Sequence, residues 1–350
     1  MLEQRRLQKL GYSTLMVSLP REWVTQMNLK RGDTVTLSTD ERGRLVVNPS
    51  LQVQETKTKC VISAERVDDI LLGRIILGAY IAGHETLEIR TGNQEFTQGQ
   101  LDVVKKTLGE LIGLGIVEQG VNRLVVQSFL DPSKFPIEGL IMRLNLIVES
   151  MRDLAVKALL EERNEFAKQV LDLDVEADKV YFLATRLLLQ AVQDKAIAER
   201  VGLENPKNIV GDRLVVKFLE EVGDYAQDIA RSVMKVNDLR YYNMEVNKEI
   251  ATLHEHVKNI SRLAMHSLFK NDIIAANTAI VEYGNLAILV EKVDSDLDRK
   301  LVSVLAVATP LKSIVNSIKQ TGRYYTIASE TMINRSVEGN TEITELVPLS

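Results

Sequence analysis

Pairs of aspartates recur at the spacing of one helical turn in two distant stretches of the sequence. The stretch LDLDVEADKVYF carries Asp174 and Asp178, and VEKVDSDLDRKL carries Asp294 and Asp298. Side chains at i and i+4 share one helix face, so each pair places two like charges side by side, at a cost of about a few tenths of a kcal/mol. A bound cation would compensate this repulsion, because hard metal ions take carboxylate oxygens as ligands.

The first pair lies on the apolar stripe of its predicted helix. Asp178 follows Val175 by three residues and precedes Phe182 by four, and Asp174 lies one turn before it. This spacing puts both carboxylates on the face that packs against other helices. Carboxylates near a core are costly unless a positive group compensates them.

A second row of acids follows on the next predicted helix. Glu220, Asp224 and Asp228 are spaced at i, i+4 and i+8 beside an apolar line. Gly223 costs this helix about 1 kcal/mol relative to alanine, which indicates a close helix approach or a tight site. No basic residue of this half convincingly shares the stripe. The acids therefore either hold a metal ion between facing helices, as in di-metal bundle proteins, or line a solvated groove.

The elements that would position these acids are helices from residue 132 onward. Short connections join six amphipathic stretches, which predicts two antiparallel three-helix bundles at about 133–236 and 240–335 within a helical domain of residues 132–336. The predicted helices are 136–162, 164–199, 209–236, 240–268, 271–305 and 309–335. The tail, residues 337–350, lacks periodicity and is predicted to be flexible.

Residues 57–131 predict a small α/β domain. Strand patterns alternate with two helical patterns, which favours one sheet with helices on a single face. The sequence contains neither G-x-x-x-x-G-K-[ST] nor G-x-G-x-x-G, so no phosphate-binding loop is predicted. A spacer or a support for dimerisation is the expected role.

Residues 1–52 predict a β-rich head with one short helix. So short a segment buries little surface alone, so an intertwined dimer is expected. Residues 1–50 contain eight Lys/Arg and five Asp/Glu, a balance of +3, so the remaining 300 residues carry −8 of the total of −5. This asymmetry predicts a polyanionic partner for the head, and the residues expected to contact DNA phosphates are Arg5, Arg6, Lys9, Arg21, Lys30 and Arg31. The alternative is that these cations only protect exposed strand edges from aggregation.

The head resembles the swapped-hairpin domains of the AbrB/SpoVT type. The matching features are the Gly-Tyr-Ser step at residues 11–13, the V-x-L-P helix start at 17–20 and G-D-x-V-x-L at 32–37. The resemblance implies a homodimeric swapped-hairpin β-barrel whose strands interleave and whose basic side chains meet DNA.

The helical region is similar to the PhoU family of phosphate-uptake regulators. In that family each three-helix half carries an acidic x-x-x-Asp motif and an E-R-[IV]-G-D-like motif that together hold metal ions. Asp174 and Asp178 match the first motif, and Glu220, Gly223 and Asp224 match the second, with Asp228 one turn on. Glu221 stands where the family has arginine, which makes the site more acidic. The resemblance implies bound divalent or transition metal, with iron, zinc and magnesium as candidates.

The second half departs from this pattern. Its stretch SIKQTGRYYTIA has Lys319 and Arg323 in place of the acids, although Gly322 is kept. These cations could neutralise Asp294 and Asp298 as a buried ion-pair network, which is the alternative to a second metal site here.

Composition narrows the function further. The single Cys60 excludes an intrachain disulfide, the most apolar run is too short to span a bilayer, and no signal peptide is recognisable, so a cytoplasmic protein without membrane insertion is expected. His254 and His256 are expected at the surface. With no catalytic constellation or nucleotide motif, an enzyme is not expected, although a metal-dependent hydrolase or oxidase in the bundle is a rival.

The expected function is a dimeric, DNA-binding regulator of phosphate uptake. Its PhoU-like metal-binding body would receive a signal, and the resemblance implies contact with the ATPase subunit of a phosphate ABC transporter. The alternative is an adaptor that acts by protein contact only, with a head that serves for dimerisation.

Overall fold

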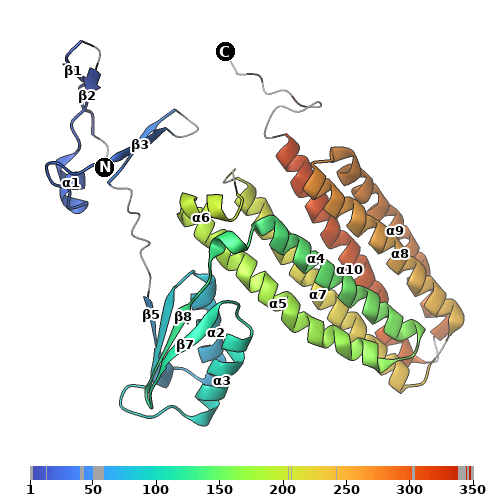
Figure 1. The fold of residues 1–350 in the computed structure, drawn as a ribbon. Helices are drawn as coiled ribbons and strands as arrows, with labels where there is room; N and C mark the ends of the chain where they lie inside the picture. The colour runs from blue at the N-terminus through green and yellow to red at the C-terminus, as the bar shows by residue number, and fades with distance from the viewer. Residues whose placement is uncertain are drawn as a thin grey trace. The chain divides into compact units, whose positions relative to one another are not determined.

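The computed structural model of the chain describes residues 3–12, 14–39, 43–49, 59–203, 205, 207–241, 243–301, 304–337, 344 and 347. Most of the predicted tail, 337–350, lies outside them. The chain divides into two compact units, Met1–Lys57 and Thr58–Ser350 (Figure 1). The first holds the head, and the second holds both the α/β layer and the helical body.

The head consists of two antiparallel hairpins and one short helix. Strand β1 (Gln8–Leu10) pairs with β2 (Thr14–Met16), and β3 (Thr36–Thr39) pairs with β4 (Leu45–Asn48) in a separate two-stranded sheet. Helix α1 (Arg21–Gln26) starts directly after Pro20. Gly32 has a φ of +97°, a backbone conformation that favours glycine, and it turns the chain toward β3.

The head has no core of its own. None of its described residues is buried, and large apolar side chains stand in solvent, including Leu10 at 59%, Leu15 at 63% and Leu37 at 58% exposure. A folded domain must bury such side chains to offset the entropy cost of ordering the chain. The expected swapped pairing with a second copy stays a prediction from this exposure.

The α/β layer is a four-stranded sheet with the strand order β5-β6-β8-β7, in which only β5 and β6 are parallel. Its elements are β5 (Lys59–Ser63), the 3-10 turn η1 (Ala64–Arg66), α2 (Asp69–Ile81), β6 (Thr86–Arg90), α3 (Gln98–Gly109), β7 (Leu114–Gln119) and β8 (Arg123–Ser128). The expected alternation of strands and helices in this region is confirmed.

The two faces of this sheet differ in chemistry. Leu87 and Ile89 of β6 are buried in the core shared with α2 and α3. Glu88 between them points to the opposite face, where three cationic side chains, Lys59, Arg90 and Arg123, cover it completely. These hydrogen bonds and charges lower the pKa of Glu88.

The remainder is helical. After the 3-10 turn η2 (Pro132–Lys134), the helices are α4 (Ile137–Leu160), α5 (Asn164–Gln193), α6 (Lys195–Arg200), α7 (Asn208–Asp238), α8 (Met244–Lys270), α9 (Ile273–Leu301) and α10 (Leu305–Ser336). The predicted helix 164–199 is interrupted at Asp194, which leaves the helical conformation and accepts a hydrogen bond from the amide of Ala196 to begin α6.

The long helices form two sets of three that share one core. Helices α4, α5 and α7 pack against one another, as do α8, α9 and α10, and α7 packs along α10 between the sets (Figure 1). A single cluster of buried apolar residues runs through both sets. The first set carries the acids of the predicted metal site.

Helix α5 also holds the α/β layer. Phe182 packs against the core of that layer, and Arg186 donates hydrogen bonds to the carbonyl oxygens of Tyr80, Gly83 and His84 at the end of α2. The helix that carries Asp174 and Asp178 is thus anchored to the sheet domain.

Within the described residues, α9 alone is long and apolar enough to cross a bilayer, with a mean hydropathy of 1.6 over its best window. Here it packs against α8 and α10. The absence of membrane insertion stays a prediction.

Two helical glycines should respond oppositely to alanine. A Cβ at Gly322 would lie 2.6 Å from Leu286 Cδ2, whereas a Cβ at Gly284 would meet nothing within 4 Å. Gly322→Ala is expected to lower the free energy of unfolding by about 1–3 kcal/mol through overpacking. Gly284→Ala is expected to raise it by up to about 1 kcal/mol through helix propensity. Urea unfolding followed by circular dichroism measures both; equal effects would contradict the packing described.

Candidate functional site

Four of the predicted acids come together between α5 and α7. Carboxylate oxygens of Glu220, Glu221 and Asp224 on α7 lie within 4.8 Å of one another. Asp174 reaches the same place from α5, since a Cβ at Gly223 would lie 3.9 Å from its Oδ1. Asp178, one turn further along α5, is close enough to Asp174, Glu220 and Asp224 to feel their charges. Glu221 is the member that was not among the predicted ligands.

The electrostatics of this acid cluster (Asp174, Asp178, Glu220, Glu221 and Asp224) oppose ionisation. Partial burial, reinforced by the neighbouring carboxylates, raises the pKa of Asp178 to about 7. Burial together with Glu220 and Asp174 raises the pKa of Asp224 to about 6. Both shifts have the same causes, since burial and like charges disfavour the ionised form of a carboxyl group.

One basic residue does reach the cluster, contrary to the expectation that none shares the stripe. Lys217 Nζ lies 2.7 Å from Glu221 and also pairs with Glu220. It lies three and four residues before these glutamates on α7, so its long side chain extends along the helix, over the ring of Tyr181. Among the ion pairs of the described chain, none involves Asp174 or Asp178.

Asp228 does not join the cluster. It is exposed, and its nearest charge partner is Arg231 on the same helix, at 4.0 Å. One further turn along α7 carries the side chain away from Asp174 and Asp178 because the two helices are antiparallel.

The donor set fits a cation that prefers oxygen ligands. Five carboxylates with one lysine leave an excess of negative charge between two rigid helices, and a divalent ion would relieve it. Asp174, Asp178, Glu220 and Asp224 would supply ligands, while Glu221 would share Lys217 or join them. Carboxylates without histidine or cysteine favour magnesium or iron over zinc.

The second aspartate pair has a different partner from the one predicted. Lys312 Nζ lies 2.6 Å from Asp298 and 3.8 Å from Asp294. Neither Lys319 nor Arg323 forms an ion pair with them within the residues that the structure describes. Ion pairs are present, but the assignment of their cation was wrong, and they are not buried as predicted, since Asp294 is 49% and Asp298 65% exposed.

The error is one of register between antiparallel helices. In the first half, Asp174 is the acid that lies nearest to Gly223. In the second half, the side chain nearest to Gly322 is Leu286. Asp294 lies two turns beyond Leu286 along α9, where it meets the early part of α10 and therefore Lys312. The position that corresponds to Asp174 is thus apolar in the second half, and no acid cluster forms there among the described residues.

The expectation that His254 lies at the surface was also wrong. Its side chain is buried, and Nε2 lies 2.8 Å from Asp153 Oδ1. Burial lowers the pKa of His254, so the neutral form is favoured. The position follows Ile250 by four residues on the apolar stripe of α8, which is the signal that could have located it.

The basic residues of the head are all exposed. The side chains predicted to contact DNA are all on the surface: Arg5, Arg6, Lys9, Arg21, Lys30 and Arg31. Arg5 is partly engaged, with Nη2 at 2.6 Å from Glu3 and Nη1 at 3.3 Å from the Ser18 hydroxyl. Exposed cations such as these are available to a phosphate backbone.

Comparison with known proteins separates the same two parts. Residues 8–54 match the family model of antidote-toxin recognition MazE, bacterial antitoxin, and residues 141–233 match the PhoU domain. The PhoU match covers α4 to α7 and therefore includes the acid cluster. No curated protein matches the chain.

Solved structures match the helical body. PhoU from Pseudomonas aeruginosa is similar with a TM-score of 0.52 at 14% identity, over 56% of this chain and 93% of that one. The phosphate transport system regulatory protein PhoU from Streptococcus pneumoniae has a TM-score of 0.50 at 13% identity, over 61% of this chain and 96% of that one. The chain therefore joins a head similar to the MazE/AbrB-like domain to a helical body that matches the PhoU domain model over residues 141–233 and has the PhoU fold.

Proposed function

We propose that this protein is a dimeric, DNA-binding regulator of phosphate uptake whose PhoU-like body holds metal and receives the signal. The observation that carries the proposal is the union, in one chain, of a basic MazE/AbrB-like head and a PhoU domain. The solved relatives include a phosphate transport system regulatory protein, which supports phosphate transport as the process regulated. No enzymatic activity is proposed.

Dimerisation through the head is part of the proposal. The head exposes Leu10, Leu15 and Leu37 and has no buried residue among those described. A second copy that interleaves its hairpins would cover these side chains. The exposed arginines and lysine of residues 5–9 would then be doubled on one surface, where they meet DNA phosphates.

Signal transfer would link the helical body to the DNA-binding head. A metal ion at the acid cluster and a partner on the helical body, for which the phosphate transporter ATPase is the candidate, would favour one arrangement of the dimer. Such a partner can change DNA affinity only through a difference in its affinity for the two arrangements. A cytoplasmic location follows from these partners.

The Arg5→Ala/Arg6→Ala/Lys9→Ala variant tests the DNA function. The wild type is expected to shift promoter fragments of phosphate-uptake genes, and the variant to lose about three units per subunit from the slope of log affinity against log salt. Gel shifts over a salt series measure this. The matched control removes three exposed lysines of the body, Lys195, Lys248 and Lys292, with the same net charge change.

The alternative function, an adaptor that acts by protein contact only, predicts a different result. If neither the wild type nor the variant shifts DNA at low salt while the protein remains a dimer, the head serves only for dimerisation. Equal losses in the head variant and the body control would mean that net charge, rather than the arm, attracts DNA.

A further inference from the structure

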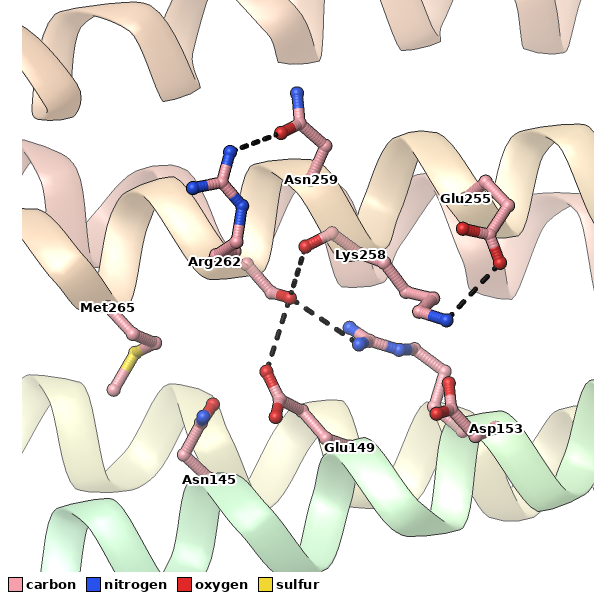
Figure 2. Close-up of a pocket in the computed structure, with 10 residues that line it drawn as sticks. Asn145, Glu149, Asp153, Glu255, Lys258, Asn259, Arg262 and Met265 are labelled. Carbon is pink, nitrogen blue, oxygen red and sulfur yellow. Dashed lines mark hydrogen bonds and ion pairs between the residues drawn. The ribbon is translucent and has the colours of Figure 1, made fainter.

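A polar groove lies between the first helices of the two sets, on α4 and α8. Its volume is about 570 Å³, and all its lining residues belong to these two helices. Figure 2 shows Glu149 and Asp153 on the α4 wall, with Lys258 and Arg262 on the α8 wall. The acid cluster lies on α5 and α7, so this groove is a separate place in the fold.

Arg152 of this groove is a buried cation with unsatisfied donors. Its side chain is 2% exposed, and neither Nε nor Nη1 has a hydrogen-bond partner among the described residues. Nη2 reaches across the groove from α4 to donate to Ser261 Oγ on α8, at 3.4 Å. The guanidinium carbon lies 5.6 Å from the centre of the Tyr325 ring, and no described carboxylate lies within ion-pair distance.

Such a group is costly unless an anion accompanies it. A guanidinium taken out of water needs a counter-charge and partners for its N–H groups. An oxyanion supplies both, because the forked N–H groups of arginine match two oxygens of a carboxylate, sulfate or phosphate.

An acceptor stands beside the donors. The Ser261 hydroxyl that accepts from Arg152 lies 3.3 Å from Glu149 Oε1 and 2.9 Å from the carbonyl oxygen of Lys258, and can donate to either. No described cation forms an ion pair with Glu149. Asp153 pairs with His254 at 2.8 Å and Lys258 with Glu255 at 3.3 Å, while Arg262 donates a hydrogen bond to Asn259 Oδ1 at 3.0 Å. A fully deprotonated anion would be repelled by Glu149. An anion that keeps a proton could donate it to Glu149.

We propose that the α4–α8 groove binds a protonated phosphate group, with Arg152 and the Ser261 hydroxyl on its oxygens and Glu149 accepting its remaining proton. A phosphate group holds its last proton close to neutral pH, whereas sulfate has none to donate. The proposal deepens the proposed function, on which its biological meaning rests, because it places the regulated substance on the regulator.

Calorimetric titration of the full-length protein at constant ionic strength tests this inference. The probes are inorganic phosphate, glycerol phosphate and sodium sulfate. Saturable binding of inorganic phosphate and weaker or absent binding of sulfate are expected. Equal binding of glycerol phosphate identifies the phosphomonoester group, rather than free phosphate, as the ligand class. An absence of saturable phosphate binding up to about 10 mM would overturn the proposal.

Variants assign the binding to the groove. Arg152→Met is expected to weaken phosphate binding at least about tenfold, and Glu149→Gln to remove the preference over sulfate. Arg143→Met, an exposed arginine of α4 outside the groove, is the matched control and should bind as the wild type does. If Arg152→Met does not fold, Arg152→Lys takes its place, since it keeps the charge but loses the forked donors.

Failure of this inference is distinguishable from failure of the proposed function. A Glu220→Gln/Asp224→Asn variant should keep phosphate binding; loss there, with normal binding by Arg152→Met, would move the phosphate to the acid cluster and overturn the groove assignment. The gel shift does not depend on the groove, so DNA binding without phosphate binding would refute this inference alone.

Discussion

Arg186→Met is expected to lower the free energy of unfolding of the unit that begins at Thr58 by about 3–5 kcal/mol. Arg186 is 1% exposed and donates to the carbonyl oxygens of Tyr80, Gly83 and His84, at 3.2 Å for Gly83 and 3.1 Å for His84. Its guanidinium also lies 4.8 Å from the centre of the Tyr80 ring. Methionine fills the space but leaves these acceptors at the end of α2 without their donor.

Urea unfolding followed by circular dichroism at the helical band measures the loss. Lys179→Met, on the same helix, is the control: Lys179 makes only a 2.8 Å pair with Glu176 toward solvent, so a change within about 0.5 kcal/mol is expected. If Arg186→Met matched this control, water rather than Arg186 would satisfy the carbonyl oxygens, and α5 would not be fastened to the sheet.

The two buried arginines should respond in opposite directions. Arg186 donates to three carbonyl oxygens and leaves only Nε without a partner among the described residues, whereas Arg152 leaves both Nε and Nη1 without one. Replacing a poorly paired buried charge by an apolar residue is often neutral or stabilising. Arg152→Met is therefore expected to unfold at the wild-type temperature or above it when phosphate is absent, while Arg186→Met unfolds well below it.

The anchoring of α5 gives the acid cluster a route to the α/β layer. Asp178 lines a groove of about 330 Å³ together with residues of α2, such as Arg74, residues of α3, and Glu110 directly after α3. Phe182, one turn on, is part of the α/β core, and Arg186 follows after another turn. The acid cluster and the α/β layer therefore share one helix, α5.

Local patterns predicted the elements well and the contacts between them less well. The apolar period of 3.6 located the long helices because each buries one continuous stripe. The acids of α5 and α7 met because these two helices, separated in the chain only by the short α6, pack against one another. Asp298 found Lys312 rather than Lys319 or Arg323 because the register of α9 on α10 is set by buried contacts such as Gly322 against Leu286. A sequence motif does not reveal such contacts between helices.

Buried cations were missed although a signal for them existed. Arg152 lies four residues after Val148 and four before Val156, on the apolar stripe of α4. The same reasoning that singled out Asp178 applies to it. Which groups such an arginine meets, a helix end for Arg186 and a groove for Arg152, depends on tertiary packing and could not be deduced from spacing.

Asp178→Asn should stabilise the metal-free protein and destabilise the metal-loaded one. The folded-state pKa of Asp178 is raised from 3.8 to about 7, so between these values the unfolded chain is ionised while the folded carboxyl holds its proton. Stability contributed by the protonated form is present at low pH and is lost as the pH rises through this window. Asparagine has nothing to ionise, so in chelator at pH 8 it should gain about 1–2 kcal/mol, after allowance for the partial exposure of the site.

The effect of Asp178→Asn on stability is expected to depend on both pH and metal. This dependence distinguishes a metal centre from a solvated groove wall. In chelator the advantage of Asp178→Asn over the wild type should disappear as the pH falls to about 4. With magnesium or iron present, the wild type should melt higher and the variant should not respond. Asp228→Asn, outside the cluster and beside Arg231, should behave as the wild type in every condition. A variant that is less stable than the wild type in chelator at pH 8 would mean that a protein cation already compensates Asp178, and the acids would then need no metal ion.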